Sequence, residues 1–113
     1  MGLDLAKRKQ KYFDLTMVDG TKLQIKKANE ELIYEMEEFE KRLRKSSNVK
    51  EVFEGIKTLV LKIINRNTAN KVYDALLFNL KGEDGELLYD YDVCMAIFAE
   101  YNKFTYEVLR NPN

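Results

Sequence analysis

Near the start of the chain, two short runs of alternating apolar and polar residues flank a turn that contains glycine. The apolar positions of the two runs are Phe13, Leu15, Met17, Leu23 and Ile25. A two-residue Asp-Gly loop would put the two apolar sets on opposite faces, because side chains alternate along a strand. A three-residue loop at residues 18–20 instead pairs Leu15 with Leu23 and brings both sets to one face. The pattern therefore predicts a β-hairpin over about residues 12–26, with one apolar face, one polar face and unpaired edges.

Helical periodicity predicts four helices in the rest of the chain. Their expected ranges are about 30–45, 49–65, 69–81 and 90–110. Asn29 is a typical N-cap for the first helix. The third carries the apolar stripe Val72, Leu76 and Leu80, and Gly82 fits as its C-terminal stop. We therefore expect an α+β, mostly helical fold in which the hairpin packs on four helices, since an isolated hairpin is marginal in water.

The first two helices are expected to be structural. The second is the most apolar and is predicted to be the central helix. Its Gly55 costs roughly 1 kcal/mol relative to alanine, and a close crossing by another helix would account for that residue. On the first helix, acids precede bases by four residues, a spacing that suits intrahelical ion pairs. The expected pairs are Glu37 with Lys41, Glu38 with Arg42 and Glu40 with Arg44.

Composition limits the class of protein. A chain of 113 residues, 45% apolar and 34% charged, is typical of one globular domain. We expect residues 1–11 to form a charged N-terminal arm and residues 12–113 to form a single globular domain. Acidic and basic residues number 19 each, so the chain has no overall field that would attract nucleic acid or an anionic membrane.

The sequence favours a cytoplasmic protein. The single cysteine, Cys94, cannot form an internal disulfide, and no apolar segment of signal-peptide length opens the chain. No apolar run reaches the 18 or so residues of a membrane span. We therefore expect no membrane association.

Candidate catalytic chemistry is sparse. The chain contains no histidine, which removes the commonest acid/base near neutral pH. Cys94 falls in an apolar helical stripe, so we interpret it as a buried small hydrophobe. An acidic cluster could suit a hard cation, but its spacing matches no calcium loop. Its members are Glu83, Asp84, Glu86, Asp90 and Asp92. We expect no enzyme, cofactor or metal site, and leave open whether this loop binds a cation.

Aromatic residues crowd the last predicted helix on more than one of its faces. Exposed aromatics are common anchors of protein interfaces, and burial in the core is the alternative. The candidate partner-binding residues are Tyr101, Phe104 and Tyr106.

Two stretches carry a resemblance to a known family: the hairpin FDLTMVDGTKLQIKKAN and the end of the second helix, IINRN. With the order of elements around them, they resemble the short tail assembly chaperones of long-tailed phages and prophages of Gram-positive bacteria. The resemblance implies a non-enzymatic protein of the bacterial cytoplasm that binds the tape measure protein and recruits tail tube subunits. It supplies no catalytic residues, and self-association is left open.

The alternative function is that of a small nucleic-acid-binding regulator, although nucleic acid is not the expected partner. It would use a basic patch on the arm and hairpin, with binding that weakens steeply as salt is added. The residues of this patch are Lys7, Arg8, Lys9, Lys11, Lys26 and Lys27.

Overall fold

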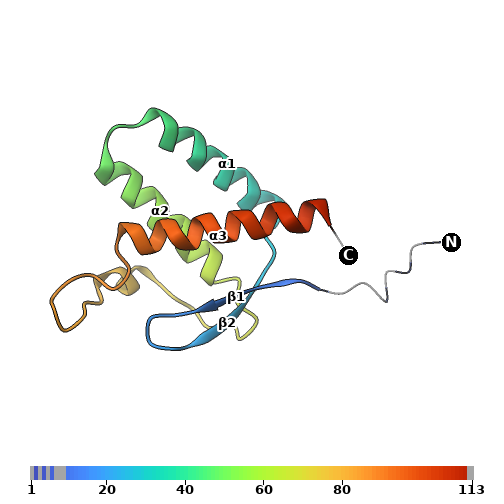
Figure 1. Ribbon diagram of the computed structural model, residues 1–113, viewed down its shortest axis with the longest axis horizontal. Coiled ribbons are helices and arrows are strands. Elements are labelled where there is room, and N and C mark those ends of the chain that lie inside the picture. Colours follow the sequence, from blue (N-terminus) through green and yellow to red (C-terminus); the bar gives the residue numbers. More distant parts are fainter. Residues whose placement is uncertain (1, 3, 5, 7–9, 112–113) are drawn as a thin grey trace.

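A computed structural model describes residues 2, 4, 6 and 10–111 of the chain. Over these residues, a two-stranded antiparallel hairpin lies beside three α-helices and a short 3₁₀ helix (Figure 1). The elements are β1 (Tyr12–Thr16), β2 (Lys22–Lys26), α1 (Glu30–Lys45), α2 (Val49–Ile64), η2 (Ala75–Asn79) and α3 (Tyr91–Arg110). The expected α+β, mostly helical class is confirmed. The expectation of four helices is wrong, because the described chain has three α-helices.

The hairpin adopts the predicted register. Leu15 lies opposite Leu23, and the loop between the strands takes its three residues from positions 18–20. Gly20 has a φ of 90°, a value that glycine adopts without the strain a Cβ would bring. The amide of Gly20 donates to the carbonyl of Met17 at 2.9 Å, which closes the turn.

The expectation that both edges of the hairpin are unpaired is wrong for β2. The Lys26 amide donates to the Arg66 carbonyl at 3.1 Å, and the Thr68 amide donates to the Gln24 carbonyl at 2.8 Å. The chain that leaves α2 thus returns along β2 and covers its outer edge, which would otherwise offer free backbone groups.

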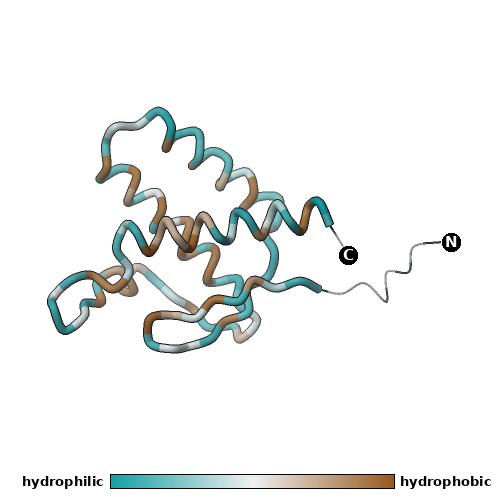
Figure 2. The backbone as a smooth tube through the Cα atoms, viewed as in Figure 1, coloured by the Kyte–Doolittle hydropathy of each residue, from teal (hydrophilic) through white to brown (hydrophobic). Residues whose placement is uncertain are grey.

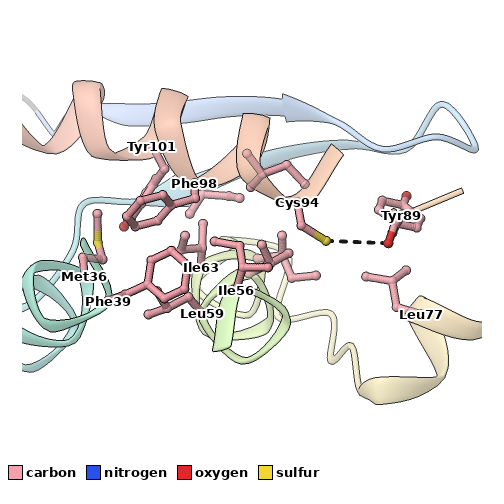
Figure 3. Close-up of a cluster of buried hydrophobic side chains, with 14 of the residues drawn as sticks. Met36, Phe39, Ile56, Leu59, Ile63, Leu77, Tyr89, Cys94, Phe98 and Tyr101 are labelled. Atoms are coloured by element: carbon pink, nitrogen blue, oxygen red, sulfur yellow. Dashed lines mark hydrogen bonds between the residues drawn. The ribbon is translucent and has the colours of Figure 1, made fainter. Parts of the chain in front are cut away.

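α2 is the central helix, as expected, and it contacts α1, α3, β2 and η2. Figure 3 shows side chains of α1, α2 and α3 meeting in one core, and Figure 2 shows apolar residues running along α2. The predicted close crossing at Gly55 is present, since a Cβ built there would lie 3.3 Å from Cε1 of Phe39 on α1. Among the predicted ion pairs of α1, Glu40 and Arg44 approach to 3.9 Å, whereas Glu38 pairs with Lys41 rather than Arg42.

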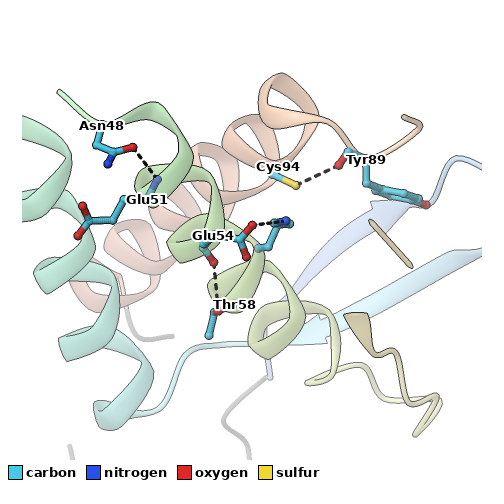
Figure 4. A network of polar contacts seen from close by, with 7 residues as sticks. Asn48, Glu51, Glu54, Thr58, Tyr89 and Cys94 are labelled. Atoms are coloured by element: carbon cyan, nitrogen blue, oxygen red, sulfur yellow. Dashed lines mark hydrogen bonds and ion pairs between the residues drawn. The ribbon is translucent and has the colours of Figure 1, made fainter. Parts of the chain in front are cut away.

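Polar side chains cap the N-termini of the three α-helices, close to the starts that the sequence predicts. Asn29 accepts a hydrogen bond from the Leu32 amide at the start of α1, and Asn48 accepts one from the Glu51 amide at the start of α2 (Figure 4). Asp90 does the same for α3 through the Val93 amide. These side chains satisfy amides that have no partner within the helix.

The predicted helix over 69–81 is absent from the structure, and two asparagines explain why. The side chain of Asn65 accepts from the Tyr73 amide at 2.8 Å and donates to the Tyr73 carbonyl at 2.9 Å. The buried side chain of Asn67 does the same for Lys71, at 3.0 and 2.8 Å. Backbone groups that a helix would need are therefore bonded to side chains in an irregular segment, and only η2 remains of the predicted helix.

Gly82 does not end a helix. Its amide donates to the Glu86 carbonyl at 2.9 Å within a tight turn that follows the bridge between Lys81 and Leu87. No helix in the described part of the chain has the combination of length and hydropathy that crossing a membrane requires.

Candidate protein-binding groove

Tyr101, the first of the predicted contact residues, is completely buried. Its hydroxyl donates to the Lys26 carbonyl at 2.7 Å, and its ring packs edge-on against Phe13 with the ring centroids 5.4 Å apart. The expectation that Tyr101 is an exposed aromatic is wrong, because α3 lies over the apolar face of the hairpin and this ring fills the space between them.

The other two predicted residues do not share one surface. Phe104 is half-buried, with its ring 5.7 Å from that of Phe13 and 5.9 Å from that of Tyr101. Tyr106 is 40% exposed on α3. Of the three aromatics, Tyr106 is therefore the one that a partner could reach without opening the fold.

Cys94 is buried, as the sequence indicated. Its Sγ donates to the Tyr89 carbonyl at 3.6 Å (Figures 3 and 4). Burial raises the pKa of the thiol from 9.0 to about 11. The sulfur is thus protonated and covered near neutral pH, which leaves it a poor nucleophile.

The acidic cluster serves local backbone structure. Asp84 accepts a hydrogen bond from the Glu86 amide, and Asp90 caps α3. Within the described ranges, no group of three or more Cys, Asp or Glu side chains is placed to hold a metal ion.

The predicted basic patch is described only in part. Lys7, Arg8 and Lys9 lie outside the described residues. Lys11 is half-buried and donates to the Asn111 carbonyl, while Lys26 is exposed.

A groove with a volume of about 290 Å³ lies between the hairpin loop and the segment over residues 72–89. Its lining residues are Met17, Val18, Asp19, Val72, Tyr73, Asp74, Leu76, Leu77, Leu80, Leu88 and Tyr89. Four of them are aliphatic and strongly exposed: Val18 at 50%, Val72 at 89%, Leu76 at 67% and Leu80 at 49%. We call these four the groove aliphatics. They are four of the nine large apolar side chains that are exposed in the described part of the chain.

The floor of the groove is rigidly tied to the core. Met17, Leu77 and Tyr89 are buried there. The amide of Val18 donates to the Tyr89 hydroxyl at 3.0 Å, which fixes the hairpin loop to the residues that precede α3. Burial also raises the pKa of Tyr89, so this hydroxyl keeps its proton well past neutral pH.

The outward position of the groove aliphatics follows from the local backbone. Asn65 bonds both backbone groups of Tyr73, and Asp74 then caps η2 through the Leu76 amide at 2.9 Å. In this short helix Leu77 and Phe78 turn into the core, which leaves Leu76 on the solvent side.

The groove offers side chains rather than a strand edge. Both backbone groups of Tyr73 are bonded to Asn65, and the Leu80 carbonyl accepts from the Leu88 amide. The volume of the groove, about 290 Å³, is at the lower end of the range that small-molecule sites occupy and does not decide the kind of ligand. The strong exposure of the groove aliphatics favours apolar side chains of another protein.

The sequence does not reveal this groove, because Val72, Leu76 and Leu80 have the spacing of one apolar helix face, which is typical of a helix that packs on a core. Two features of the sequence could have indicated otherwise. Asn65 and Asn67 precede the stripe, and Asp74, a residue type that favours caps over helix interiors, interrupts it.

Comparison of the chain with family models, with curated proteins and with solved structures finds no match. The groove must therefore be interpreted from its own chemistry.

Proposed function

We propose that the protein is a non-catalytic adaptor that binds another protein through the groove. The observation that carries this proposal is the exposure of the groove aliphatics, between 49% and 89%, around one concave surface. Clustered exposed apolar side chains mark interaction sites in soluble proteins. Polar residues at the margin, such as Asp19 and Asp74, match the usual anatomy of an interface with an apolar centre.

A non-catalytic role is supported by the chemistry of the side chains. The sequence has no histidine, and Cys94, its one cysteine, is a buried thiol with a raised pKa. The groove itself is lined mainly by aliphatic and aromatic residues, with two carboxylates engaged in local hydrogen bonds.

More specifically, we propose a tail assembly chaperone of a long-tailed phage or prophage, acting in the cytoplasm of its bacterial host. The resemblance of the hairpin and of the end of α2 to that family supports this role. In it, the protein would bind the tape measure protein, keep it soluble and recruit tail tube subunits. Groove aliphatics that cover apolar side chains of a long helical partner would serve that purpose.

The test is co-expression with the tape measure protein from the same genome, followed by affinity purification. The wild-type chain should retain the tape measure protein, whereas Val72→Asp and Leu76→Asp should lose it. Val49→Asp is the matched control, because Val49 is 69% exposed but lies outside the groove, at the start of α2. Circular dichroism should show the same helix content for all variants.

The proposal fails if the wild-type protein does not co-purify with the tape measure protein, or if both groove variants still do. Tyr106→Ala in the same assay tests a contribution from α3. This residue is proposed as a second contact because its ring is exposed.

A further inference from the structure

We infer that the groove takes a basic amphipathic helix of the partner, with apolar residues in the groove and Lys or Arg residues along its margin. This inference rests on the proposed protein-binding function and adds the chemistry of the partner. Two features of the groove support it: an excess of carboxylates, and backbone groups that are already hydrogen-bonded.

Carboxylates dominate the charged groups at the groove. Within the groove and the segment over residues 72–89, the acids are Asp19, Asp74, Glu83, Asp84 and Glu86, and the base is Lys81. Asp19 and Asp74 line the groove itself. A hydrogen bond from the Thr21 amide lowers the pKa of Asp19, so its carboxylate is charged near neutral pH. Lys71, just before the segment over residues 72–89, also acts on Asp19 and helps to lower its pKa.

The remaining acids stand at one end of the groove. Leu80 and Leu88 both line it, and the Leu88 amide donates to the Leu80 carbonyl at 3.0 Å. The tight turn over residues 82–86 projects beyond this pair, and its acidic side chains are exposed. An occupant therefore meets negative charge both beside the groove and at its end, and cationic residues suit that arrangement.

The backbone of the groove favours a helix over a strand as occupant. Strand addition needs free amides and carbonyls along an edge. At this groove, Tyr73 has both groups bonded to Asn65, and the Leu80 carbonyl is bonded to Leu88. A helix needs no such groups, because it satisfies its own backbone and docks through apolar side chains spaced three and four residues apart.

The test uses a displayed library of helical peptides with leucines at that spacing and random residues on the flanks. Peptides selected on the wild-type protein should be enriched in Lys and Arg on the flanks. The affinity of one selected synthetic peptide is then measured by fluorescence anisotropy. Asp19→Asn with Asp74→Asn should weaken its binding roughly two- to thirtyfold, since each of the two exposed ion pairs contributes about 0.2–1 kcal/mol.

This double variant changes charge with little change in structure. Asparagine can accept the same backbone hydrogen bonds from Thr21 and Leu76. The matched control is Asp14→Asn with Glu107→Gln, which changes net charge equally at exposed positions outside the groove. It should leave the affinity unchanged, and added salt should weaken the wild-type complex toward the affinity of the groove variant.

The outcomes separate this inference from the proposed function. Selected peptides with neutral or acidic flanks that still lose binding to Leu76→Asp would overturn the basic occupant and leave the groove as a protein site. Equal affinity for the wild-type protein and for the Asp19→Asn, Asp74→Asn variant would overturn it as well. If no peptide depends on Leu76, the groove does not bind helices, and both proposals fail.

Discussion

The hydroxyl of Tyr101 joins α3 to the end of β2, and its ring fills the space between them. Tyr101→Phe should lower the free energy of unfolding by about 1–2 kcal/mol, because the Lys26 carbonyl loses its donor. Tyr101→Ala should cost about 3–5 kcal/mol through the cavity it leaves. Urea unfolding followed by circular dichroism measures both changes.

Tyr106→Ala serves as the comparison for these variants. Its side chain is 40% exposed, so its loss should change stability by less than about 0.5 kcal/mol. A larger cost for Tyr106→Ala than for Tyr101→Ala would contradict the assignment of Tyr101 to the core.

Cys94 should make the protein lose stability in alkali. Its pKa is 9.0 in an exposed state and about 11 in the fold. A raised pKa means that the folded state holds the proton more tightly, so this contribution is complete below pH 9 and is lost as the pH rises toward 11. The loss should reach about 2–3 kcal/mol.

Urea unfolding under a reducing agent, at a series of pH values up to about 11, measures how the free energy of unfolding falls with pH. In Cys94→Ala the decline should begin later, near pH 10, where Tyr101 starts to contribute because burial raises its pKa from 10.0 to about 12. Identical pH profiles for the wild type and the alanine variant would show that the thiol is not responsible.

At the scale of elements, Asn65 and Asn67 decide the conformation of the segment after α2. Asn67→Ala removes hydrogen bonds to both backbone groups of Lys71 and one to the Ile64 carbonyl. It should cost about 2–3 kcal/mol, because a buried side chain and its three hydrogen bonds are lost together. Asn79→Ala, at an exposed position of η2, is the control and should be nearly neutral.

Amide hydrogen exchange gives the more specific measurement. In Asn67→Ala the Lys71 amide should exchange faster, while in Asn65→Ala the Tyr73 amide should do so, since each asparagine bonds one of these residues. Unchanged exchange in both variants would mean that the asparagines do not hold this segment.

Gly55 tests the crossing of α1 and α2. Alanine in a helix is favoured over glycine by roughly 1 kcal/mol. Here its Cβ would press on the buried Phe39 ring, which packs against Phe98 at 5.2 Å. Gly55→Ala should therefore bring no gain in stability in the wild type. In a Phe39→Leu background the same change should stabilise by about 1 kcal/mol, and a double-mutant cycle measures the coupling. Equal gains in stability in both backgrounds would show that the Phe39 ring moves aside for the added methyl group at little cost.

These elements also show how far the sequence predicts the fold. The hairpin register follows from it, because side chains alternate with a period of two, and a three-residue loop, unlike a two-residue loop, brings Leu15 and Leu23 to the same face. The three α-helices follow from apolar periodicity and from caps such as Asn29. The helix expected over 69–81 failed because side chains of Asn65 and Asn67 bond backbone four and eight residues away, and periodicity does not record such contacts.

The candidate site was less predictable for the same reason. An apolar stripe has the same sequence whether it is buried or left in solvent, so the spacing of Leu76 does not show that it is exposed. Tyr101 has the spacing of the buried residues of α3, but an aromatic at that position can also anchor a partner, and the spacing does not show that the hairpin docks there. Both positions depend on how elements distant in the sequence come together.

At the scale of the whole molecule, the stability of the fold should not depend on the groove aliphatics. Val72→Ser and Leu76→Ser should change the free energy of unfolding by less than about 0.5 kcal/mol, because both side chains are mostly in solvent. Leu77→Ala should cost about 2–5 kcal/mol, because the neighbouring leucine is buried. Thermal and urea unfolding measure these differences.

Binding of a hydrophobic dye provides a second measurement, and the serine variants should bind less of it than the wild type. If they lose as much stability as Leu77→Ala, the exposed aliphatics support the fold, and their availability for a partner would be refuted.

The bond from the Tyr101 hydroxyl to the Lys26 carbonyl joins residues 75 positions apart. During synthesis the hairpin leaves the ribosome long before the helix that covers its apolar face. At about 5–20 residues per second, this delay is roughly four to fifteen seconds. For that time Phe13 has no Tyr101 or Phe104 to pack against, and transiently exposed apolar surface of this kind favours aggregation. Slow translation of the last third of the message should therefore lower the yield of folded protein.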